Sequence, residues 1–218
     1  MRAATLCLFA ALFVISWATA QELLTNPGFE SGPADGLPDG WVRYGGTVPE
    51  SRVEVSPEAR SGQRCVRIID TGPNERDGKW AAGVSQTLPV EQGRAYRASV
   101  WARCLARNHP DAMALQLTFM PSRTVFYARL SPEIGGDWVR FTTVGEPAAG
   151  DTHVTLYLYS MHFWTCDYLV DDVSLTVLDA EQVGQRYPLA KHGGYGIEAV
   201  RALNLRTPIV SGGKAAAT

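Results

Sequence analysis

Alternation of apolar and polar residues dominates the chain between residues 22 and 178 and predicts β-strands. The clearest runs are "SRVEVS" (51–56), "AMALQLTFM" (112–120) and "HVTLYLYS" (153–160). Turn-forming residues separate these runs, and no segment before residue 180 shows a helical period. We therefore expect an all-β fold, an antiparallel β-sandwich or jelly roll. The pattern predicts about nine strands, in the ranges 51–56, 64–69, 82–90, 95–103, 112–120, 124–130, 138–144, 153–160 and 168–178.

The two ends of the chain follow different patterns. Residues 1–20 carry one basic residue, Arg2, then an apolar run that ends in Ala-Thr-Ala. This is typical of a signal peptide cleaved before Gln21, so we expect a secreted protein, extracellular or periplasmic. Residues 21–179 then form the sandwich. Residues 180–218 have the composition of a linker or a poorly ordered tail, in which 197–205 could form one short helix.

Charge and cysteine content narrow the choice of partners. The chain has 20 basic and 22 acidic residues and no basic run, which disfavours nucleic acid and anionic membranes as partners. Outside the signal peptide the cysteines are Cys65, Cys104 and Cys166. Either one disulfide with a free thiol or three buried thiols fits this odd number. The spacing matches neither a zinc site nor a CxxC redox pair.

Signs of catalysis are weak in this sequence. Glycoside hydrolysis needs two opposed carboxylates in a cleft, but most Asp and Glu residues fall in turns between the predicted strands. There is no GxSxG or HExxH motif, and the four histidines lack the spacing of metal ligands. We expect a protein that is not an enzyme.

Polar and aromatic side chains share the non-core face of several predicted strands. Strand parity places Trp101 and Arg103 opposite the core residues of 95–103, and it does the same for Gln116, Tyr157 and Tyr159 in their strands. Aromatic rings pack on the C–H faces of sugars, while amides and guanidinium groups bind sugar hydroxyls. These residues therefore predict a sugar-binding groove. The alternative is that the aromatics cover the outside of a sheet or pack under a loop.

The remaining tryptophans are placed by their surroundings. Trp80 lies in the polar stretch "NERDGKWAAG", where it is either a platform for a sugar ring or a contact across the rim of the fold. Trp41 and Trp138 each begin an apolar stretch and are expected to fill the core. Trp164 follows His162 and Phe163 and is either a lip facing a ligand or a buried corner.

Two acidic residues lie beside core positions at opposite ends of the chain. Glu30 directly follows Phe29, and Asp171 in "YLVDDVSL" shares the parity of the core residues Val173 and Leu175, so it is predicted to point inward. A buried carboxylate is costly unless it is paired. Because the first and last strands of a jelly roll can be neighbours, Glu30 and Asp171 could meet and bind a hard cation such as calcium. The alternative is a set of salt bridges to Arg60, Arg64 or Arg67.

Five phrases occur in an order that resembles a known family. They are "NPGFESG…PDGW" (26–41), "ARSGQRCVRI" (59–68), "GVSQTLPVEQGRAYRASVWAR" (83–103), "DWVRFTT" (137–143) and "YLVDDVSL" (168–175). Together they resemble the carbohydrate-binding modules of families 4, 9 and 22, which share a galactose-binding-domain-like jelly roll. The resemblance covers residues 23–178, and "MHFWTCDY" (161–168) departs from it.

This resemblance implies a function and a metal site. The function is noncatalytic binding of a polysaccharide, a β-glucan, a xylan or a similar plant or microbial glycan, by a monomer that acts beside an attached or separate glycoside hydrolase. Stacking is expected from Trp80, Trp101, Tyr157 and Tyr159, and hydrogen bonds from Arg103 and Gln116. A structural calcium is expected at Glu30, Ser61, Gln63 and Asp171, or at nearby backbone carbonyls. The alternative function is an extracellular protein-interaction or envelope scaffold with no sugar ligand.

Overall fold

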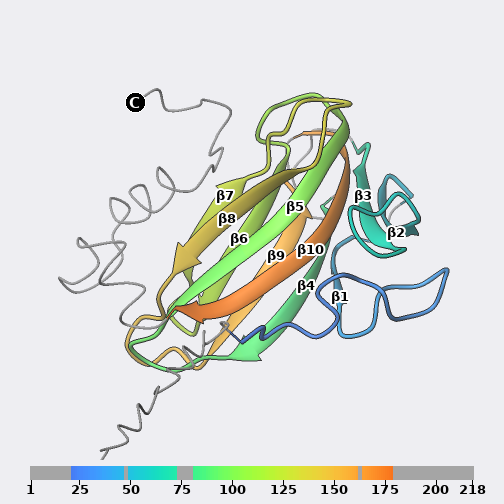
Figure 1. Ribbon diagram of the computed structural model, residues 1–218. Helices are drawn as coiled ribbons and strands as arrows, with labels where there is room; N and C mark the ends of the chain where they lie inside the picture. The colour runs from blue at the N-terminus through green and yellow to red at the C-terminus, as the bar shows by residue number, and fades with distance from the viewer. Residues whose placement is uncertain (1–20, 47–48, 73–80, 162–163, 179–218) are drawn as a thin grey trace, which may run out of the picture.

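Two five-stranded antiparallel sheets stack face to face in the computed structural model, which describes residues 21–46, 49–72, 81–161 and 164–178 (Figure 1). Sheet I has the order β1-β4-β9-β6-β7, and sheet II has the order β2-β3-β10-β5-β8. The predicted β-sandwich is confirmed. The predicted signal peptide, residues 1–20, and the tail beyond residue 178 lie outside the described residues. Within the described ranges, the structure contains no helix that could span a lipid bilayer.

The strands follow the predicted ranges closely. Nine of them match the predicted runs. The tenth, β1, was not predicted, because Gly and Pro surround its short segment. The bounds are β1 Val42–Gly45, β2 Ser51–Ser56, β3 Cys65–Asp70, β4 Ala82–Pro89, β5 Ala95–Arg107, β6 Met113–Met120, β7 Thr124–Arg129, β8 Val139–Gly145, β9 His153–Ser160 and β10 Cys166–Leu178.

The core lies between the two sheets, and strand parity predicted it correctly. Val100 of β5, Leu117 of β6 and Leu156 of β9 are all fully buried. Burying each such side chain contributes about 1.5–3 kcal/mol. Trp41 is 5% exposed, as predicted for a core residue, whereas Trp138 is only half-buried. The three described cysteines are buried and form no disulfide. Of the two alternatives, three buried thiols is therefore confirmed.

A β-bulge in β10 corrects the predicted direction of Asp171. Three steps from Asp171 to Ser174 in β10 span only two steps from Trp101 to Ser99 in β5, and Asp172 has a φ of 46°. The extra residue reverses the parity of the strand. Asp171 is fully buried, but it pairs with Trp101 and lies on the outer face of sheet II, away from the core between the sheets.

The N-terminal segment lies beside β10 beyond the first residues of β3, so the predicted proximity of the first and last segments is confirmed. The amide of Leu23 donates to the carbonyl of Leu175 (2.9 Å), and the amide of Val173 donates to the carbonyl of Pro27 (2.9 Å). The segment is anchored by Phe29, which is fully buried and whose ring centroid lies 5.0 Å from that of Trp41. This arrangement brings Glu30 towards β10.

Asp151 ties two turns together and provides a test of pH dependence. Its buried carboxylate accepts hydrogen bonds from the Ser122 amide (2.7 Å), the Ser122 hydroxyl (2.8 Å) and the Ala148 amide (2.8 Å). Burial alone would raise the pKa of Asp151, but these hydrogen bonds outweigh it and hold the pKa below its usual value.

A depressed carboxyl pKa stabilises the fold above the unfolded-state pKa of about 4, and this contribution disappears as the pH falls through the folded-state value. We expect Asp151→Asn to lower the free energy of unfolding by about 2 kcal/mol at pH 7. Urea unfolding at several pH values should show the gap to wild type closing below about pH 4. A gap that is constant between pH 7 and pH 3 would contradict this role for Asp151.

Candidate functional site

The predicted sugar-contacting residues divide between the two sheets, which corrects the expectation of a single groove. Trp101 and Arg103 lie on β5 in sheet II, whereas Gln116 lies on β6 and Tyr157 and Tyr159 lie on β9 in sheet I. All five point away from the core, so the two groups face opposite directions. They cannot line one groove. Trp80 lies outside the described residues.

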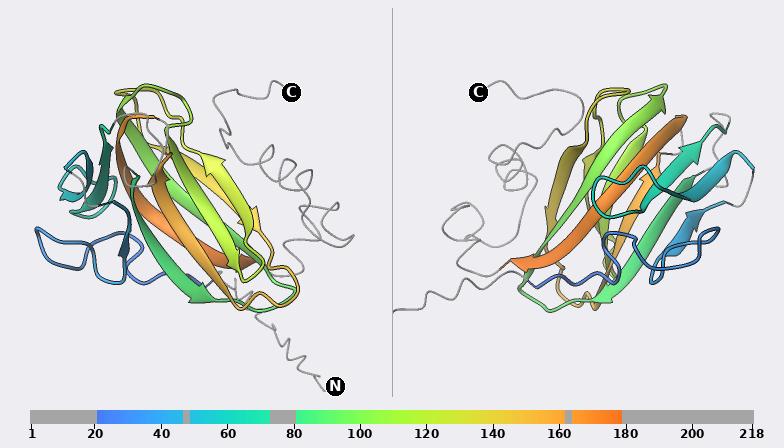
Figure 2. Two further views of the ribbon diagram at one scale, coloured as in Figure 1. Left: turned by 180° about the vertical axis from the view of Figure 1, so that it is seen from behind. Right: turned by 45° about the vertical axis from the view of Figure 1, so that its right-hand side comes forward.

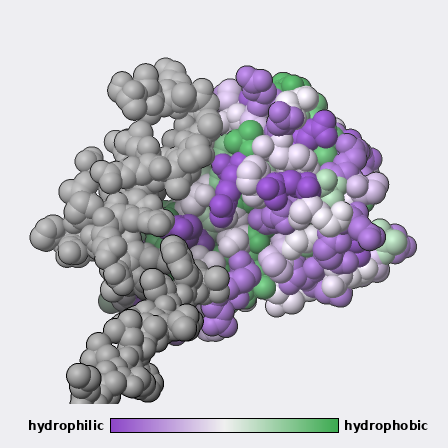
Figure 3. All heavy atoms as spheres, in the orientation of Figure 1, coloured by the Kyte–Doolittle hydropathy of each residue, from purple (hydrophilic) through white to green (hydrophobic). Residues whose placement is uncertain are grey.

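On sheet II, the chain itself contacts both predicted side chains. The guanidinium of Arg60 lies 3.8 Å from the centroid of the Trp101 ring and is held by an ion pair with Asp172 (2.6 Å). Arg103 donates to the carbonyl of Gly136 (3.1 Å). In Figure 3, which is viewed from the side of this sheet, hydrophilic residues dominate the visible surface. A sugar would have to displace Arg60 from this face of Trp101, so sheet II is the weaker candidate.

The outer face of sheet I gathers tyrosines in rows that cross the strands, and we call the outward-facing residues of β1, β4, β9, β6 and β7 the tyrosine face. This side of the molecule is turned towards the viewer in the left view of Figure 2. Its first row is Tyr44, Gly83, Tyr159, Ala114 and Arg129. A Cβ atom on Gly83 would lie 2.3 Å from the carbonyl oxygen of Leu158 and 2.7 Å from the Cβ of Tyr159, so a larger residue does not fit at this position. The rings of Tyr44 and Tyr159 meet across it, with centroids 5.2 Å apart.

The second row of the tyrosine face combines aromatic rings with an amide. It consists of Val42, Ser85, Tyr157, Gln116 and Tyr127. Tyr157 is half-buried, and Tyr127 is 49% exposed. The Gln116 Oε1 atom accepts a hydrogen bond from the hydroxyl of the neighbouring tyrosine in the first row (2.7 Å). The amide is therefore held in place beside two rings.

Three tyrosines of these rows form one cluster. The rings of Tyr44 and Tyr157 are 5.0 Å apart at 66°, and those of Tyr157 and Tyr159 are 6.4 Å apart at 75°. Such edge-to-face contacts stabilise the pairs and fix the ring orientations. Burial raises the pKa of Tyr159 to about 12, an effect that the positive charge of Arg129 opposes. Burial also raises the pKa of Tyr44, so the hydroxyls of Tyr44 and Tyr159 are neutral hydrogen-bonding groups at physiological pH.

Threonines extend the tyrosine face towards one end of the sheet. The third row is Thr87, Thr155, Thr118 and Val125. Thr87 and Thr155 share a hydrogen bond between their hydroxyls (2.8 Å), and Thr118 accepts one from Gln116 (2.9 Å). Apart from Arg129, the face combines planar rings with neutral donors and acceptors, and Tyr159 is its most buried ring at 7% exposed.

Sequence reasoning missed three side chains of the tyrosine face that carry a ring or a charge. Tyr44 lies on β1, the strand that the pattern did not predict, while Tyr127 and Arg129 lie on β7. Val125, Tyr127 and Arg129 alternate along "TVFYARL", so parity could have identified the last two as outward-facing. Tyr44 carries no such signal in its glycine-rich context.

On the other sheet, the predicted metal-binding residues meet around the loop 60–64. The Asp171 carboxylate accepts hydrogen bonds from the amides of Arg60 (2.8 Å), Ser61 (3.1 Å) and Asp172 (2.7 Å). Burial raises the pKa of Asp171, and the three amides only partly offset this rise. We call this arrangement, together with the contacts of Glu30 to the same loop, the carboxylate clasp.

Glu30 contributes the other half of the carboxylate clasp. Its carboxylate accepts hydrogen bonds from the amides of Gln63 (3.1 Å) and Arg64 (3.2 Å). Gly62 has a φ of 66°, and a Cβ atom there would lie 2.2 Å from a Glu30 oxygen. Glycine is therefore required for the close approach between loop and carboxylate. The predicted meeting of Glu30 and Asp171 at one loop is confirmed.

The donor set of the clasp suits a hard cation only in part. Carboxylate oxygens are calcium ligands, and both carboxylates lie at the loop that the resemblance implies. However, the described hydrogen bonds to the carboxylates of Glu30 and Asp171 come from backbone N–H groups. The described residues hold no group of three or more His, Cys, Asp and Glu side chains that could bind a metal. Backbone carbonyls would have to complete a calcium site, so calcium stays a prediction.

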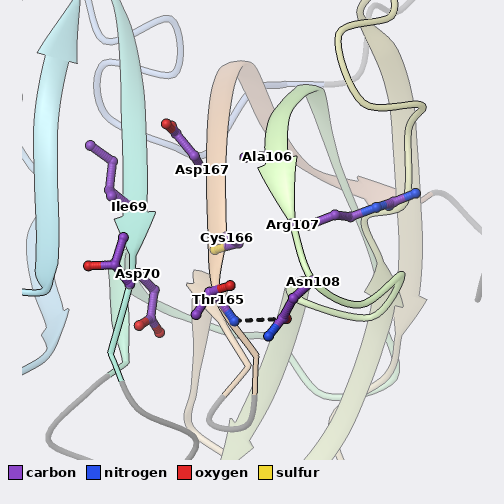
Figure 4. Close-up of a pocket in the computed structure, with 9 residues that line it drawn as sticks. Ile69, Asp70, Ala106, Arg107, Asn108, Thr165, Cys166 and Asp167 are labelled. Atoms are coloured by element: carbon purple, nitrogen blue, oxygen red, sulfur yellow. Dashed lines mark hydrogen bonds between the residues drawn. The ribbon is translucent and has the colours of Figure 1, made fainter.

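A pocket of about 300 Å³ opens near the ends of β3, β5 and β10 (Figure 4). Its polar side chains are engaged by the chain itself. The Asp70 carboxylate accepts hydrogen bonds from the Ser160 hydroxyl (2.6 Å) and the Gly72 amide (3.0 Å), and Asn108 accepts one from the amide of Thr165 (2.9 Å). Next to these last two residues in the sequence, half-buried Trp164 stacks on His109, with ring centroids 4.0 Å apart. The pocket is a weaker ligand candidate than the tyrosine face.

Comparison with known protein families assigns the chain to a family. The family model CBM_4_9, described as a carbohydrate binding domain, matches residues 21–165, more than half of the chain. The chain belongs to this family of carbohydrate-binding domains, which confirms the resemblance seen in the sequence. Among curated proteins, no relative matches the chain.

Solved structures share the fold at low sequence identity. A Stig cyclase from Fischerella sp. TAU is 19% identical with a TM-score of 0.58, over 73% of this chain and 98% of that chain. The enzymatically active domain of tailspike protein 4 from bacteriophage CBA120 is 11% identical with a TM-score of 0.53, over 72% and 21%. A CBM22-1 xylan-binding domain from Paenibacillus barcinonensis is 20% identical with a TM-score of 0.49, over 70% and 92%. The first two likenesses show the fold alone, and nothing further follows from the third.

Proposed function

We propose that the protein is a secreted, noncatalytic module that binds a polysaccharide on the tyrosine face. The observation that carries this proposal is the fixed cluster of Tyr44, Tyr157 and Tyr159 beside the amide of Gln116. Rings of this kind stack on the C–H patches of sugars, and the neutral polar groups around them suit sugar hydroxyls. Family membership supports a carbohydrate as the ligand.

A site that crosses a whole sheet suits a chain of sugars better than a single sugar. The tyrosine face spans all five strands of sheet I. Neighbouring strands lie about 4.8 Å apart, so the face is wide enough for several consecutive sugar rings. Modest affinity at each ring is enough to hold a partner enzyme near an insoluble substrate. We propose a glycoside hydrolase, attached or separate, as this partner, and we propose that the module itself is a monomer.

A panel of polysaccharides tests the proposed function. The full chain is run by affinity electrophoresis through gels that contain xylan, β-1,3-glucan, soluble cellulose derivatives, mannan, or uronate-rich polysaccharides, beside a protein of similar size that does not bind. We expect retardation in at least one gel, and free oligosaccharide of the same type should reverse it. Mobility unchanged across the whole panel would favour the alternative, a protein-interaction scaffold without a sugar ligand.

Chelation tests the calcium proposed for the carboxylate clasp. An ion present at about 100 times its Kd adds roughly 2.7 kcal/mol to the stability, so removing it should lower the Tm by about 5–10 °C. Thermal unfolding is measured with added calcium, with excess chelator, and after calcium is restored. A Tm that does not change in excess chelator would show that the amide donors of residues 60–64 suffice to hold Glu30 and Asp171.

A further inference from the structure

Arg129 is the one charged side chain in the first two rows of the tyrosine face. It lies at the end of the first row, separated from Tyr159 by Ala114. Its guanidinium carbon lies 4.7 Å from the centroid of the Tyr127 ring, a cation–π contact that holds the side chain along the sheet. Ala114 itself is only 1% exposed, whereas Arg129 is half-buried, so the part of this end of the row that a ligand can reach is the side chain of Arg129.

The hydrogen-bonding capacity of Arg129 is not fully used. Its Nη1 atom is buried, and among the described residues no acceptor forms a hydrogen bond with it. A buried donor without an acceptor costs free energy, and a cationic donor costs more than a neutral one. No described residue in the three rows of the tyrosine face is an Asp or a Glu. The face therefore presents a positive donor that its own side chains do not neutralise.

From this charge imbalance we infer that the tyrosine face binds a polysaccharide that contains uronic acid residues. Arg129 would bind their carboxylates. This inference rests on the proposed function. The planar guanidinium matches a carboxylate through two parallel N–H···O bonds. The carboxylate of a uronic acid lies at the edge of the sugar ring. A ring that stacks on the tyrosine cluster can thus direct its carboxylate towards the half-buried side chain of Arg129.

Pairs of polysaccharides that differ only in the carboxyl group test this inference. The full chain is titrated calorimetrically with glucuronoxylan, polygalacturonate and alginate, and with the carboxyl-reduced form of each. We expect at least one acidic polymer to bind, and its reduced form to bind about tenfold more weakly because the ion pair is lost. Binding of the acidic form should also weaken as salt is raised.

Two variants of Arg129 and one control variant assign the effect to the residue. Arg129→Gln should weaken binding of the acidic polymer about tenfold and leave the reduced polymer unaffected, so that the two forms bind alike. Arg129→Lys keeps the charge but loses the paired geometry and should give an intermediate affinity. The control is Arg52→Gln, which removes an exposed charge from sheet II and should leave binding unchanged.

The outcomes separate this inference from the proposed function. Equal binding of the acidic and reduced forms, or an Arg129→Gln variant that still prefers the acidic form, would overturn the role of Arg129 while the sugar-binding function stands. Binding of neutral polymers alone would overturn it in the same way. The chain is also titrated with sulfated dextran. Tighter binding of this polymer than of every carboxylated polymer would show that the face selects a different anion. If no polysaccharide of the wider panel binds, the proposed function itself fails.

Discussion

Asp171→Ala is expected to lower the free energy of unfolding by about 4 kcal/mol. The carboxylate of Asp171 is fully buried and accepts three backbone hydrogen bonds, two of them from the loop that also holds Glu30. Alanine leaves these amides without an acceptor, and each buried donor left unsatisfied costs about 1–3 kcal/mol. Urea unfolding in excess chelator measures the loss of the hydrogen bonds alone, apart from any bound calcium.

Two further variants are compared with Asp171→Ala, one milder substitution and one surface control. Asp171→Asn keeps the shape and one acceptor oxygen, so we expect about half the loss caused by alanine. Glu54→Ala removes an exposed carboxylate whose ion pair with Arg52 lies at the surface, and it should change stability by less than about 0.5 kcal/mol. A loss below about 1 kcal/mol for Asp171→Ala would contradict the clasp as a main link between the loop and β10.

Tyr157→Ala is expected to weaken polysaccharide binding about tenfold while the fold stays intact. Tyr157 is half-buried at the centre of the tyrosine face, between Ser85 and Gln116, and its ring contacts Tyr44. Its removal takes away stacking area and frees the neighbouring ring, an effect of about 1.4 kcal/mol on binding. Calorimetric titration with the polysaccharide found in the panel measures the affinity, and circular dichroism checks the fold.

The matched controls for Tyr157 separate stacking from hydrogen bonding. Tyr157→Phe keeps the ring and should retain most of the affinity. Trp101→Ala removes a predicted platform on sheet II, where Arg60 already lies against the ring, and it should leave binding within about twofold of wild type. Equal affinities of wild type and Tyr157→Ala would count against the tyrosine face as the binding site.

The fold could be predicted from the sequence because each strand is long enough to show its period. Alternation in 112–120 and 153–160 identified both the strands and their buried residues. β1 has only four residues, the last of them a glycine, and carries no recognisable period. A short strand of this kind forms because β4 offers it a partner, with Tyr44 opposite Gly83, and that partner is not visible in the local sequence.

The direction of Asp171 could not be predicted because parity assumes an uninterrupted strand. The bulge at Asp172 adds one residue, so Asp171 is buried as expected but lies under the 60–64 loop on the outer face of sheet II. Bulges depend on the pairing between strands and on a positive φ, here 46°. The meeting of Glu30 and Asp171 was still predicted correctly, since it depends on chain topology rather than on the direction of one side chain.

The candidate site was only half predicted for a related reason. Parity shows that Trp101 and Tyr157 both point away from the core, but it does not show which sheet each strand joins. Strand order places them on opposite sides of the sandwich. Tyr157, Tyr159 and Gln116 were named from the sequence and lie together, while Tyr44 and Arg129 joined them only through the pairing of β1 with β4 and of β7 with β6.

Amide chemical-shift mapping with a bound oligosaccharide tests the location of the site most directly. An oligosaccharide of the retained polysaccharide is titrated into the labelled full chain, and shift changes are followed by NMR for each residue. We predict that the largest changes fall on the outer face of sheet I, around Tyr44, Tyr157, Gln116 and Arg129. Changes centred on Trp101 and Arg103 in sheet II, with none on the tyrosine face, would contradict the proposed site.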